Sequence, residues 1–354
     1  MDESVAGMTE AELGALRTDD AAWDRFVEST PDGQYLQLSA WREIKQPNGW
    51  HATRVVADGG AGPIGAQVLL RKLGPLPASL GYAPCGPLAG RLDERGIVAF
   101  SAELRAVGGR ERLSHVTVDP FTDQRDVPEL LRAAGWRRAA PVQIDRTWVV
   151  DLTTEDELWQ GMRPKWRQYV QKARRAGHTI SEAGAEGVDE LFDIIVETSK
   201  RAGFLYRSRA THRAVYDAYA AGGRARTLIC RAPDGTPAAA LMLVSCGGRV
   251  VEPFGGMTAA GAAARANYLV KWEAMRSSLE RGHTLYDMWG MATPGIAHFK
   301  QGFGGREVRY PGAFDLVMRR ATRSFFLAAQ QARIVVGRIR RGGRGGRPGF
   351  AAAE

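Results

Sequence analysis

A lysine beside an aromatic residue, Phe299-Lys300, lies in the stretch of this chain whose residues are best placed to do chemistry. An apolar run from Leu285 to Gly290 predicts a β-strand, and Pro294-Gly295 predicts a break after it. The segment that follows is short and is closed by glycines that allow sharp turns, at positions 302, 304 and 305. A lysine at the carboxyl end of a strand can stabilise the oxyanion formed when an amine attacks an ester, by about 3–4 kcal/mol. The alternative is a solvated surface lysine.

Size and composition place this stretch in a folded protein of two domains. The chain has 354 residues, of which 44% are hydrophobic and 25% charged, a composition typical of globular proteins. Apolar runs of the roughly 18–20 residues that span a membrane are absent, and the acidic start does not resemble a secretory signal. Three cysteines in no metal-like spacing predict neither disulfides nor a zinc site. We therefore expect a cytoplasmic protein without a metal; no feature fixes its oligomeric state.

The order of predicted elements is repeated in the two halves of the chain. Each half gives a helix, antiparallel strands, a long helix, a strand and a short helix. In the second half the long helix is expected at 264–281, with a core stripe at Tyr268, Trp272, Met275 and Leu279. The pattern predicts a duplicated α/β domain and is similar to the acetyltransferase fold, an analogy of fold that does not determine the chemistry.

Two segments carry most of the positive charge. A helix expected from Pro164 has five basic residues and no acidic one, at Lys165, Arg167, Lys172, Arg174 and Arg175. They indicate contact with a polyanion such as RNA, or else a solvated helix face. The tail from 319 to 354 has nine Arg and one Glu, so it contributes +8 of the net +9. Its first half predicts a basic amphipathic helix that binds anionic lipid or RNA, or that packs one apolar stripe on the body.

Eight short motifs follow one another along the chain. They are Trp41 and Lys45 before Gly49-Trp50; 82–87, YAPCGP; Asp119-Pro120; 165–167, KWR; Gly203-Phe204 with Arg207; 286–290, YDMWG; Phe299-Lys300 with 302–305, GFGG; and 312–317, GAFDLV. In this order they make the chain resemble the Fem (FemABX) family of aminoacyl-tRNA-dependent peptidyltransferases. The similarity runs from about Gln34 to Val317.

The resemblance implies an α/β fold of two tandem acetyltransferase-like (GNAT-like) domains with mixed, mainly antiparallel sheets. We expect the first domain at 18–152, completed by chain at about 312–340, and the second at 153–311, with the basic tail at 319–354. The implied reaction moves an amino acid from aminoacyl-tRNA to the stem-peptide amine of a peptidoglycan precursor, lipid-linked or UDP-linked. The co-substrate is the charged tRNA, no other cofactor is implied, and the tail would dock at the inner membrane face.

Site residues follow from the matching motifs. Phe299 and Lys300 are the implied reaction centre, and Asp119 is a candidate base. The implied precursor-binding residues are Lys45, Trp41, Arg207, Tyr216 and Trp289, and the basic residues from Lys165 to Arg175 are the implied tRNA contacts. The chain departs from the family pattern at Cys85, where Arg is frequent, and at Thr211 and His212, where tyrosines are frequent.

Three other functions compete with this interpretation. An acetyl-CoA-dependent N-acetyltransferase needs a glycine-rich diphosphate loop, and residues 257–264 lack its leading Arg or Gln and its second glycine. A tRNA-dependent enzyme with a small metabolite amine as acceptor would share every motif above. A non-catalytic RNA- or membrane-binding protein on the same fold would not need Lys300 for its activity.

Overall fold

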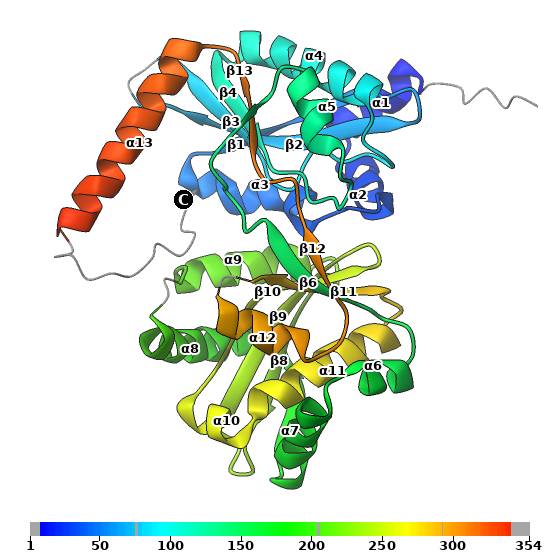
Figure 1. Cartoon of the computed structure of the whole chain (residues 1–354), viewed down its shortest axis with the longest axis vertical. Helices are drawn as coiled ribbons and strands as arrows, with labels where there is room; N and C mark the ends of the chain where they lie inside the picture. Colours follow the sequence, from blue (N-terminus) through cyan, green and yellow to red (C-terminus); the bar gives the residue numbers. More distant parts are fainter. Residues whose placement is uncertain (1–7, 75–76, 204–205, 292, 341–354) are drawn as a thin grey trace, which may run out of the picture. The chain divides into compact units, whose positions relative to one another are not determined.

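The computed structural model describes residues 8–74, 77–203, 206–291 and 293–340 (Figure 1). They form two compact units, each with its own sheet and core. The first unit takes the chain up to Asp145 and again from Tyr310, and the second takes Arg146–Arg309. Phe204 and residues 341–354 of the tail lie outside the described residues.

The first unit contains a mixed sheet in which only β3 and β4 run parallel. The chain returns from the second unit to insert β13 between β4 and β5, so the C-terminal segment completes the first sheet. The strands, in sheet order, are β1 (His51–Asp58), β2 (Pro63–Lys72), β3 (Ser79–Ala83), β4 (Leu113–Val118), β13 (Phe314–Val317) and β5 (Arg137–Arg138).

Helix α4 (Glu94–Arg110) buries Ile97, Phe100 and Leu104 in the core of the first unit. Leu13 and Leu16 of the first helix are also buried, so the unit begins before residue 18, where the sequence predicted its start. The other helices are α1 (Glu10–Thr18), α2 (Asp20–Ser29), α3 (Ala40–Lys45), α5 (Val127–Ala133) and α13 (Arg320–Arg340), with short 3-10 turns η1 (Tyr35–Gln37) and η2 (Gln46–Asn48).

The second unit is built on a seven-stranded sheet in which only β10 and β11 run parallel. Both sheets are therefore mixed and mainly antiparallel, as predicted. In sheet order the strands are β12 (Arg306–Arg309), β6 (Arg146–Asp151), β11 (Leu285–Gly290), β10 (Arg249–Met257), β9 (Pro237–Cys246), β8 (Ala225–Arg231) and β7 (Thr179–Ala183). Because β6 pairs with β11 and β12, the second unit begins at Arg146, seven residues before the predicted boundary at 153.

Helices of the second unit pack an aromatic core against this sheet. Trp272 and Met275 are almost fully buried, in agreement with the predicted core stripe. The single helix predicted at 264–281 is instead two helices, because Arg265 adopts a left-handed conformation between them. The helices are α6 (Glu155–Gly161), α7 (Pro164–Arg175), α8 (Ala185–Ala202), α9 (Arg209–Ala220), α10 (Ala259–Ala264), α11 (Ala266–Glu280) and α12 (Pro294–Gln301).

Two kinds of feature are missing from the described residues. None of the helices in that part of the chain has the length and apolar character needed to cross a membrane. Within the same residues, His, Cys, Asp and Glu side chains nowhere gather in a group of three that could hold a metal ion.

Candidate active site

Helix α12 delivers Lys300 to the carboxyl end of β11. Thr293 caps the helix by accepting a hydrogen bond from the Ile296 N–H, and Pro294 occupies its first turn, which suits a residue without an N–H. The Lys300 side chain is only 8% exposed. Its Nζ donates to the carbonyl oxygens of Met288 at 2.5 Å, Trp289 at 3.0 Å and Gly290 at 2.7 Å. An ammonium has three N–H donors, so these three consecutive carbonyls use all of them.

A buried ion pair lies beside this lysine. Glu252 of β10 accepts hydrogen bonds from Lys271 and, at 2.8 Å, from the Tyr286 hydroxyl. Burial, reinforced by the charge of Lys271, lowers the pKa of Lys300 to about 7, while the Glu252 charge acts in the opposite direction. Lys300 therefore changes charge near neutral pH, which is the range in which a catalytic group is useful.

The sheet stops pairing at this point. Strands β10 and β11 pair in parallel only from Arg249 with Leu285 to Val251 with Asp287. Beyond these residues β10 continues against β9 and β11 against β6. Glu252 directly follows the last pair, and Lys300 binds the end of β11, so the charged groups gather where the two parallel strands part. In open α/β sheets, ligands bind at the carboxyl ends of strands.

Phe299 joins the lysine to an aromatic cluster. Its ring makes edge contacts with Tyr268, at a centroid distance of 5.1 Å, and with Phe303, at 5.2 Å. The backbone carbonyl of Phe299 accepts a hydrogen bond of 2.9 Å from the indole N–H of Trp166 in α7. Gly302 is required for this packing, since a Cβ there would lie 2.2 Å from the Trp166 ring. These contacts fix the position from which Lys300 extends.

Trp289, predicted to bind substrate, has an unusual backbone. Its φ of 60° lies in the left-handed region, which is rare for a bulky residue and common at functional sites. Its N–H donates to the Asp287 carboxylate at 2.8 Å, and its carbonyl accepts from Lys300. Asp287 is held in turn by Arg249 at 2.9 Å and by the Thr147 hydroxyl at 2.6 Å.

The sequence analysis missed the supporting residues Glu252, Lys271, Tyr286 and Asp287. A signal existed for the first two, because each is a charged residue inside an apolar run, VVEPF and LVKW. Charged residues are rarely buried unless they are paired, so an acid and a base in two such runs favour a buried pair. Their proximity to Lys300 could not be predicted without the fold.

Asp119 lies in the first unit, directly after β4. One carboxylate oxygen accepts from the Tyr82 hydroxyl and the other from the Cys85 N–H, both at 2.7 Å. Burial raises the pKa of Asp119 to about 7, although both hydrogen bonds act to lower it. Asp119 thus fixes the 82–87 motif and can take up a proton at neutral pH.

The predicted precursor-binding residues are divided between the units. In the first unit Lys45 and Trp41 share α3, with the Lys45 ammonium 5.2 Å from the Trp41 ring centroid, and both are buried. In the second unit Arg207 precedes α9, and Tyr216 lies on that helix. Burial raises the pKa of the Tyr216 hydroxyl, with a smaller contribution from the Glu186 charge.

The five basic residues of α7 differ in what they contact. Arg167 donates to the carbonyls of Trp159, Gln160 and Met162, at 2.9–3.2 Å, and so closes the C-terminal end of α6. Arg174 pairs with Glu273 at 2.6 Å. The remaining three side chains are exposed, at Lys165, Lys172 and Arg175.

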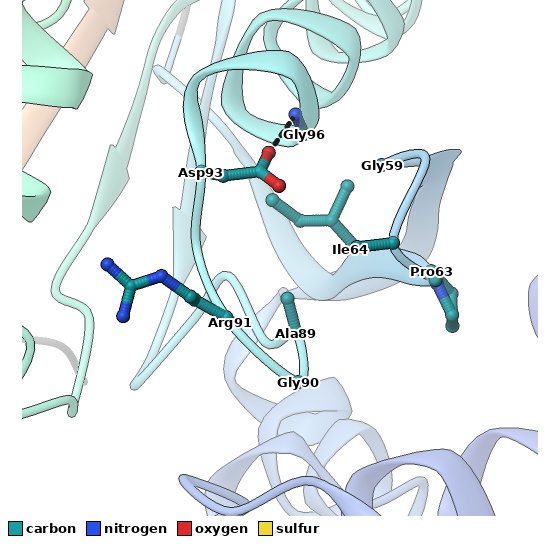
Figure 2. Close-up of a pocket in the computed structure, with 10 residues that line it drawn as sticks. Gly59, Pro63, Ile64, Ala89, Gly90, Arg91, Asp93 and Gly96 are labelled. Carbon is teal, nitrogen blue, oxygen red and sulfur yellow. Dashed lines mark hydrogen bonds between the residues drawn. The ribbon is translucent and has the colours of Figure 1, made fainter. Parts of the chain in front are cut away.

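Two hollows lie outside the contacts described above. Figure 2 shows one beside the start of α4, where the Asp93 carboxylate accepts from the Gly96 N–H at 2.7 Å. It has a volume of about 10 Å³, enough for one water molecule at most. A second, of about 360 Å³, lies beside Phe303, Gly304 and Gly305. Its two carboxylates are already engaged, Asp151 with Arg306 and Glu157 with Thr154.

Backbone N–H groups where an acetyltransferase would bind CoA diphosphate are occupied. After β10 the chain forms α10, where the Thr258 hydroxyl accepts from the Gly261 N–H. The Glu197 carboxylate accepts from the Ala259 N–H at 2.6 Å. Gly261 serves close packing rather than phosphate, since a Cβ there would lie 1.9 Å from the Ala238 carbonyl oxygen.

Comparisons with known proteins agree with this geometry. A model described as the FemAB family matches residues 18–128, and one described as an acetyltransferase (GNAT) domain matches residues 160–301. The lipid II:glycine glycyltransferase of Staphylococcus aureus strain MRSA252 is 27% identical over 222 residues, which cover 59% of this chain and 52% of the relative. The same enzyme of strain USA300 is 26% identical with the same coverage. The chain spans about half the length of the curated relatives it matches.

Solved structures show the same fold over most of the chain. The crystal structure of FemX has a TM-score of 0.78 at 19% identity, and the match covers 91% of this chain and 99% of FemX. L-PGS from Bacillus licheniformis has a TM-score of 0.52 at 13% identity, over 86% of this chain and 93% of that one. A tandem GNAT protein from the clavulanic acid pathway reaches 0.51 at 12% identity, over 88% and 97%. The predicted fold of two tandem GNAT-like units is therefore confirmed.

Proposed function

Because the chain belongs to the FemABX family, we propose that it transfers an amino acid from aminoacyl-tRNA to the stem-peptide amine of a peptidoglycan precursor. The observation that carries this proposal is the buried Lys300 at the carboxyl end of β11, where the parallel strands of the second unit part. The relatives named lipid II:glycine glycyltransferase support an amino acid as the group transferred and a peptidoglycan precursor as the acceptor.

In the proposed reaction, the acceptor amine attacks the ester carbonyl carbon of the charged tRNA. The acceptor is an ammonium group in water and must first lose one proton to become the attacking amine, and the tetrahedral intermediate then carries a negative oxygen. When the bond to the ribose oxygen breaks, that oxygen takes the second proton of the former amine, which leaves an amide and an uncharged tRNA. A positive charge held near the oxyanion in a dry site supplies the main stabilisation.

Lys300 is the source of that charge in our proposal. Since all three of its N–H donors bind carbonyls, a direct hydrogen bond to the oxyanion requires it to release one of them. The Met288 carbonyl is buried with its residue, whereas those of Trp289 and Gly290 belong to half-buried residues. Lys300 therefore most easily exchanges one of the latter two, while the others keep its charge in place.

Asp119 is assigned the role of proton acceptor. A carboxylate with a pKa of about 7 is half ionised at neutral pH and is a much stronger base than an ordinary aspartate. The residues proposed to contact the precursor are Trp41 and Lys45, in the first unit, and Arg207, Tyr216 and Trp289, in the second. Lysine and arginine suit a diphosphate, and arginine can engage two phosphate oxygens at once.

Two features count against acetyl-CoA as the acyl donor. In the second unit the N–H groups of Ala259 and Gly261 are already bonded to side chains. In the first unit the Asp93 carboxylate caps the start of α4, where a diphosphate would meet a like charge (Figure 2). Calorimetric titration with acetyl-CoA should give no binding, and micromolar affinity would favour an N-acetyltransferase instead.

A membrane-proximal location suits a lipid-linked acceptor. Helix α13 carries Phe325, which is 61% exposed, beside basic residues, and the tail from Arg319 has a formal charge of +8. Each basic residue near an anionic surface contributes about 1 kcal/mol, so we propose peripheral docking at the inner membrane face. Deletion from Arg333 onward should abolish binding to anionic vesicles at low and physiological salt. Unchanged binding would refute the docking, without bearing on the reaction.

The test of the proposed function is a transfer assay with defined substrates. Glycyl-, alanyl- and seryl-tRNA, each radiolabelled, are offered with lysine- or diaminopimelate-containing precursors in lipid-linked and UDP-linked form. Label should move into the precursor for at least one combination. If label moves instead only into a small amine from a screen of metabolites, the acceptor is wrong. If wild-type protein transfers no label to any amine, the proposed enzyme class is refuted.

A further inference from the structure

A surface of the second unit next to Lys300 combines exposed cations with aromatic rings. It is formed by the start of α7, the junction of α10 with α11, and the end of α12. We name it the cation–aromatic face; its residues are Arg163, Lys165, Tyr169, Arg265, Tyr268 and His298. Only Lys165 among these was a predicted tRNA contact.

The cations of the face rest on its rings. The Arg265 guanidinium lies 4.5 Å from the Tyr169 ring centroid, and the Lys165 ammonium lies 5.9 Å from the same centroid. The Arg163 guanidinium lies 5.7 Å from the ring of the buried Trp166. Such contacts hold a cation in position and leave its N–H groups available to a ligand.

These cations are not neutralised by acids. Among the ion pairs formed by the described residues, none includes Arg163, Lys165 or Arg265, whereas Arg174 on the same helix pairs with Glu273. The three sequence segments that build the face contain no Asp or Glu, over residues 158–181, 253–272 and 288–306. The segments that build the face therefore contribute cations and no carboxylate side chains.

An unbroken chain of ring contacts leads from the face to the reaction centre. Tyr169 contacts Tyr268 at a centroid distance of 4.8 Å, and Tyr268 contacts Phe299 at 5.1 Å. Phe299 precedes Lys300 in the sequence. On the other side the exposed His298 ring lies 5.4 Å from Trp166 and is bonded to Arg163 at 3.4 Å.

Aromatic rings and unpaired cations together fit single-stranded nucleic acid. Bases stack on aromatic side chains and guanidinium planes, while the phosphates bind the cations. An anionic lipid would need the cations but not the rings, and a duplex would present no free base to stack. We propose that the cation–aromatic face binds the unpaired nucleotides at the 3′ end of the donor tRNA. This inference rests on the proposed function, in which the ester on the terminal ribose must reach Lys300.

Two charge-matched double variants test the face. Arg163→Gln with Lys165→Gln removes two exposed cations from the face, and Lys72→Gln with Arg110→Gln removes two exposed cations from the first unit. The probe is a short fluorescent RNA that carries only the unpaired 3′ sequence of a tRNA, followed by anisotropy. The first pair should weaken RNA binding about tenfold. It should also reduce the slope of log binding constant against log salt concentration by about 0.7 for each phosphate contact that is lost. The second pair should change the RNA affinity less than twofold. Equal effects of both pairs on this affinity would refute the inference.

Variants at Tyr169 separate stacking from charge. Tyr169→Phe keeps the ring and should bind the RNA as the wild type does, whereas Tyr169→Leu should bind it about tenfold more weakly. Thermal denaturation of both variants controls for folding. If the leucine variant has wild-type stability and wild-type RNA affinity, the ring contributes nothing and the proposal fails.

Transfer kinetics distinguish this inference from the proposed function. In the active enzyme, the Arg163/Lys165 pair should raise KM for aminoacyl-tRNA about tenfold and leave KM for the precursor unchanged. Wild-type transfer with no effect of this pair would refute the face alone. RNA binding that depends on the face, in a wild-type protein without transfer activity, would refute the proposed function and support the face.

Discussion

Replacing Lys300 by methionine removes one charge from the candidate active site and leaves the rest of it intact. Methionine matches the length of the lysine stem without its ammonium, so the space beside Phe299 stays filled. Glu252 keeps both Lys271 and the Tyr286 hydroxyl as partners. The substitution therefore does not strand a buried charge, which is the usual reason for a large loss of stability.

The size of the effect follows from the contacts of Lys300. The loss of three hydrogen bonds from a charged donor costs about 1.5–3 kcal/mol each, and release from burying an ammonium returns several kcal/mol. We expect these opposing effects to lower the free energy of unfolding by less than about 4 kcal/mol. Loss of the charge at the oxyanion should lower kcat about 10²–10³-fold, equivalent to about 3–4 kcal/mol.

Single-turnover transfer from radiolabelled aminoacyl-tRNA, at saturating precursor, measures this effect directly. Lys200→Met, an exposed lysine at the end of α8, is the matched control and should retain full activity. Denaturant unfolding of both variants checks the fold. A Lys300→Met enzyme that is folded and works within threefold of the wild type would refute the catalytic role of Lys300 and favour a non-catalytic binding protein.

Further predictions concern pH, the base and a glycine. The pKa of Lys300 is lowered to about 7, so its ammonium loses a proton as pH rises above 7, and kcat/KM should fall in that range. The Lys300→Arg variant stays charged and should not show this fall between about pH 7 and 9. Spontaneous hydrolysis of the aminoacyl ester is subtracted from both profiles. Asp119→Asn can still accept from the Cys85 N–H, while its amide NH2 donates to the Tyr82 hydroxyl instead of accepting from it. This variant should lower kcat at least about 100-fold with KM unchanged, whereas a purely structural Asp119 would give near-normal kcat. The Asp119 carboxyl has a pKa near 7 in the folded protein, above its ordinary value of 3.8, so it binds a proton more tightly there than in the unfolded chain. Its contribution to stability is therefore lost as pH rises from about 4 to 7. Over this window the unfolding free energy of Asp119→Asn should rise relative to that of the wild type, and a constant difference between the two would contradict this prediction. Gly305→Ala should destabilise the protein by about 2–4 kcal/mol in thermal melts, because φ of Gly305 is +81° and a Cβ would lie 2.0 Å from the Val149 carbonyl oxygen. Gly295→Ala is the control and should be neutral, because a Cβ at Gly295 would meet no atom within 4 Å.

Local sequence signals were sufficient for the elements that carry the site. Strand β11 was predicted at the bounds that it has, because its apolar run ends at clear breaks. The core stripe of α11 followed from its period, and the mainly antiparallel pairing of both sheets was also predicted. What failed was a helix boundary. The alanine run before Arg265 favours a continuous helix, and the left-handed turn there depends on packing that propensity does not report.

Partners of charged side chains could not be predicted from the sequence. Arg167 was grouped with the RNA-binding residues of α7, a prediction that stays open, and its hydrogen bonds to the carbonyls at the end of α6 were not foreseen. The Lys271–Glu252 pair joins residues nineteen positions apart on a helix and a strand. Lys300 itself was placed correctly at the end of β11, yet its three carbonyl partners depend on the left-handed turn at Trp289.

Three successive peptide oxygens that converge on one point form a half-crown, comparable to the oxygen ring of a synthetic ammonium receptor. Such a receptor recognises the –NH3⁺ group and not the chain that bears it. In a Lys300→Ala protein the vacated channel would admit a small alkylammonium ion from solution, so a buffer amine of matching length should restore part of the lost turnover. The backbone, and not the lysine stem, then determines where the positive charge sits.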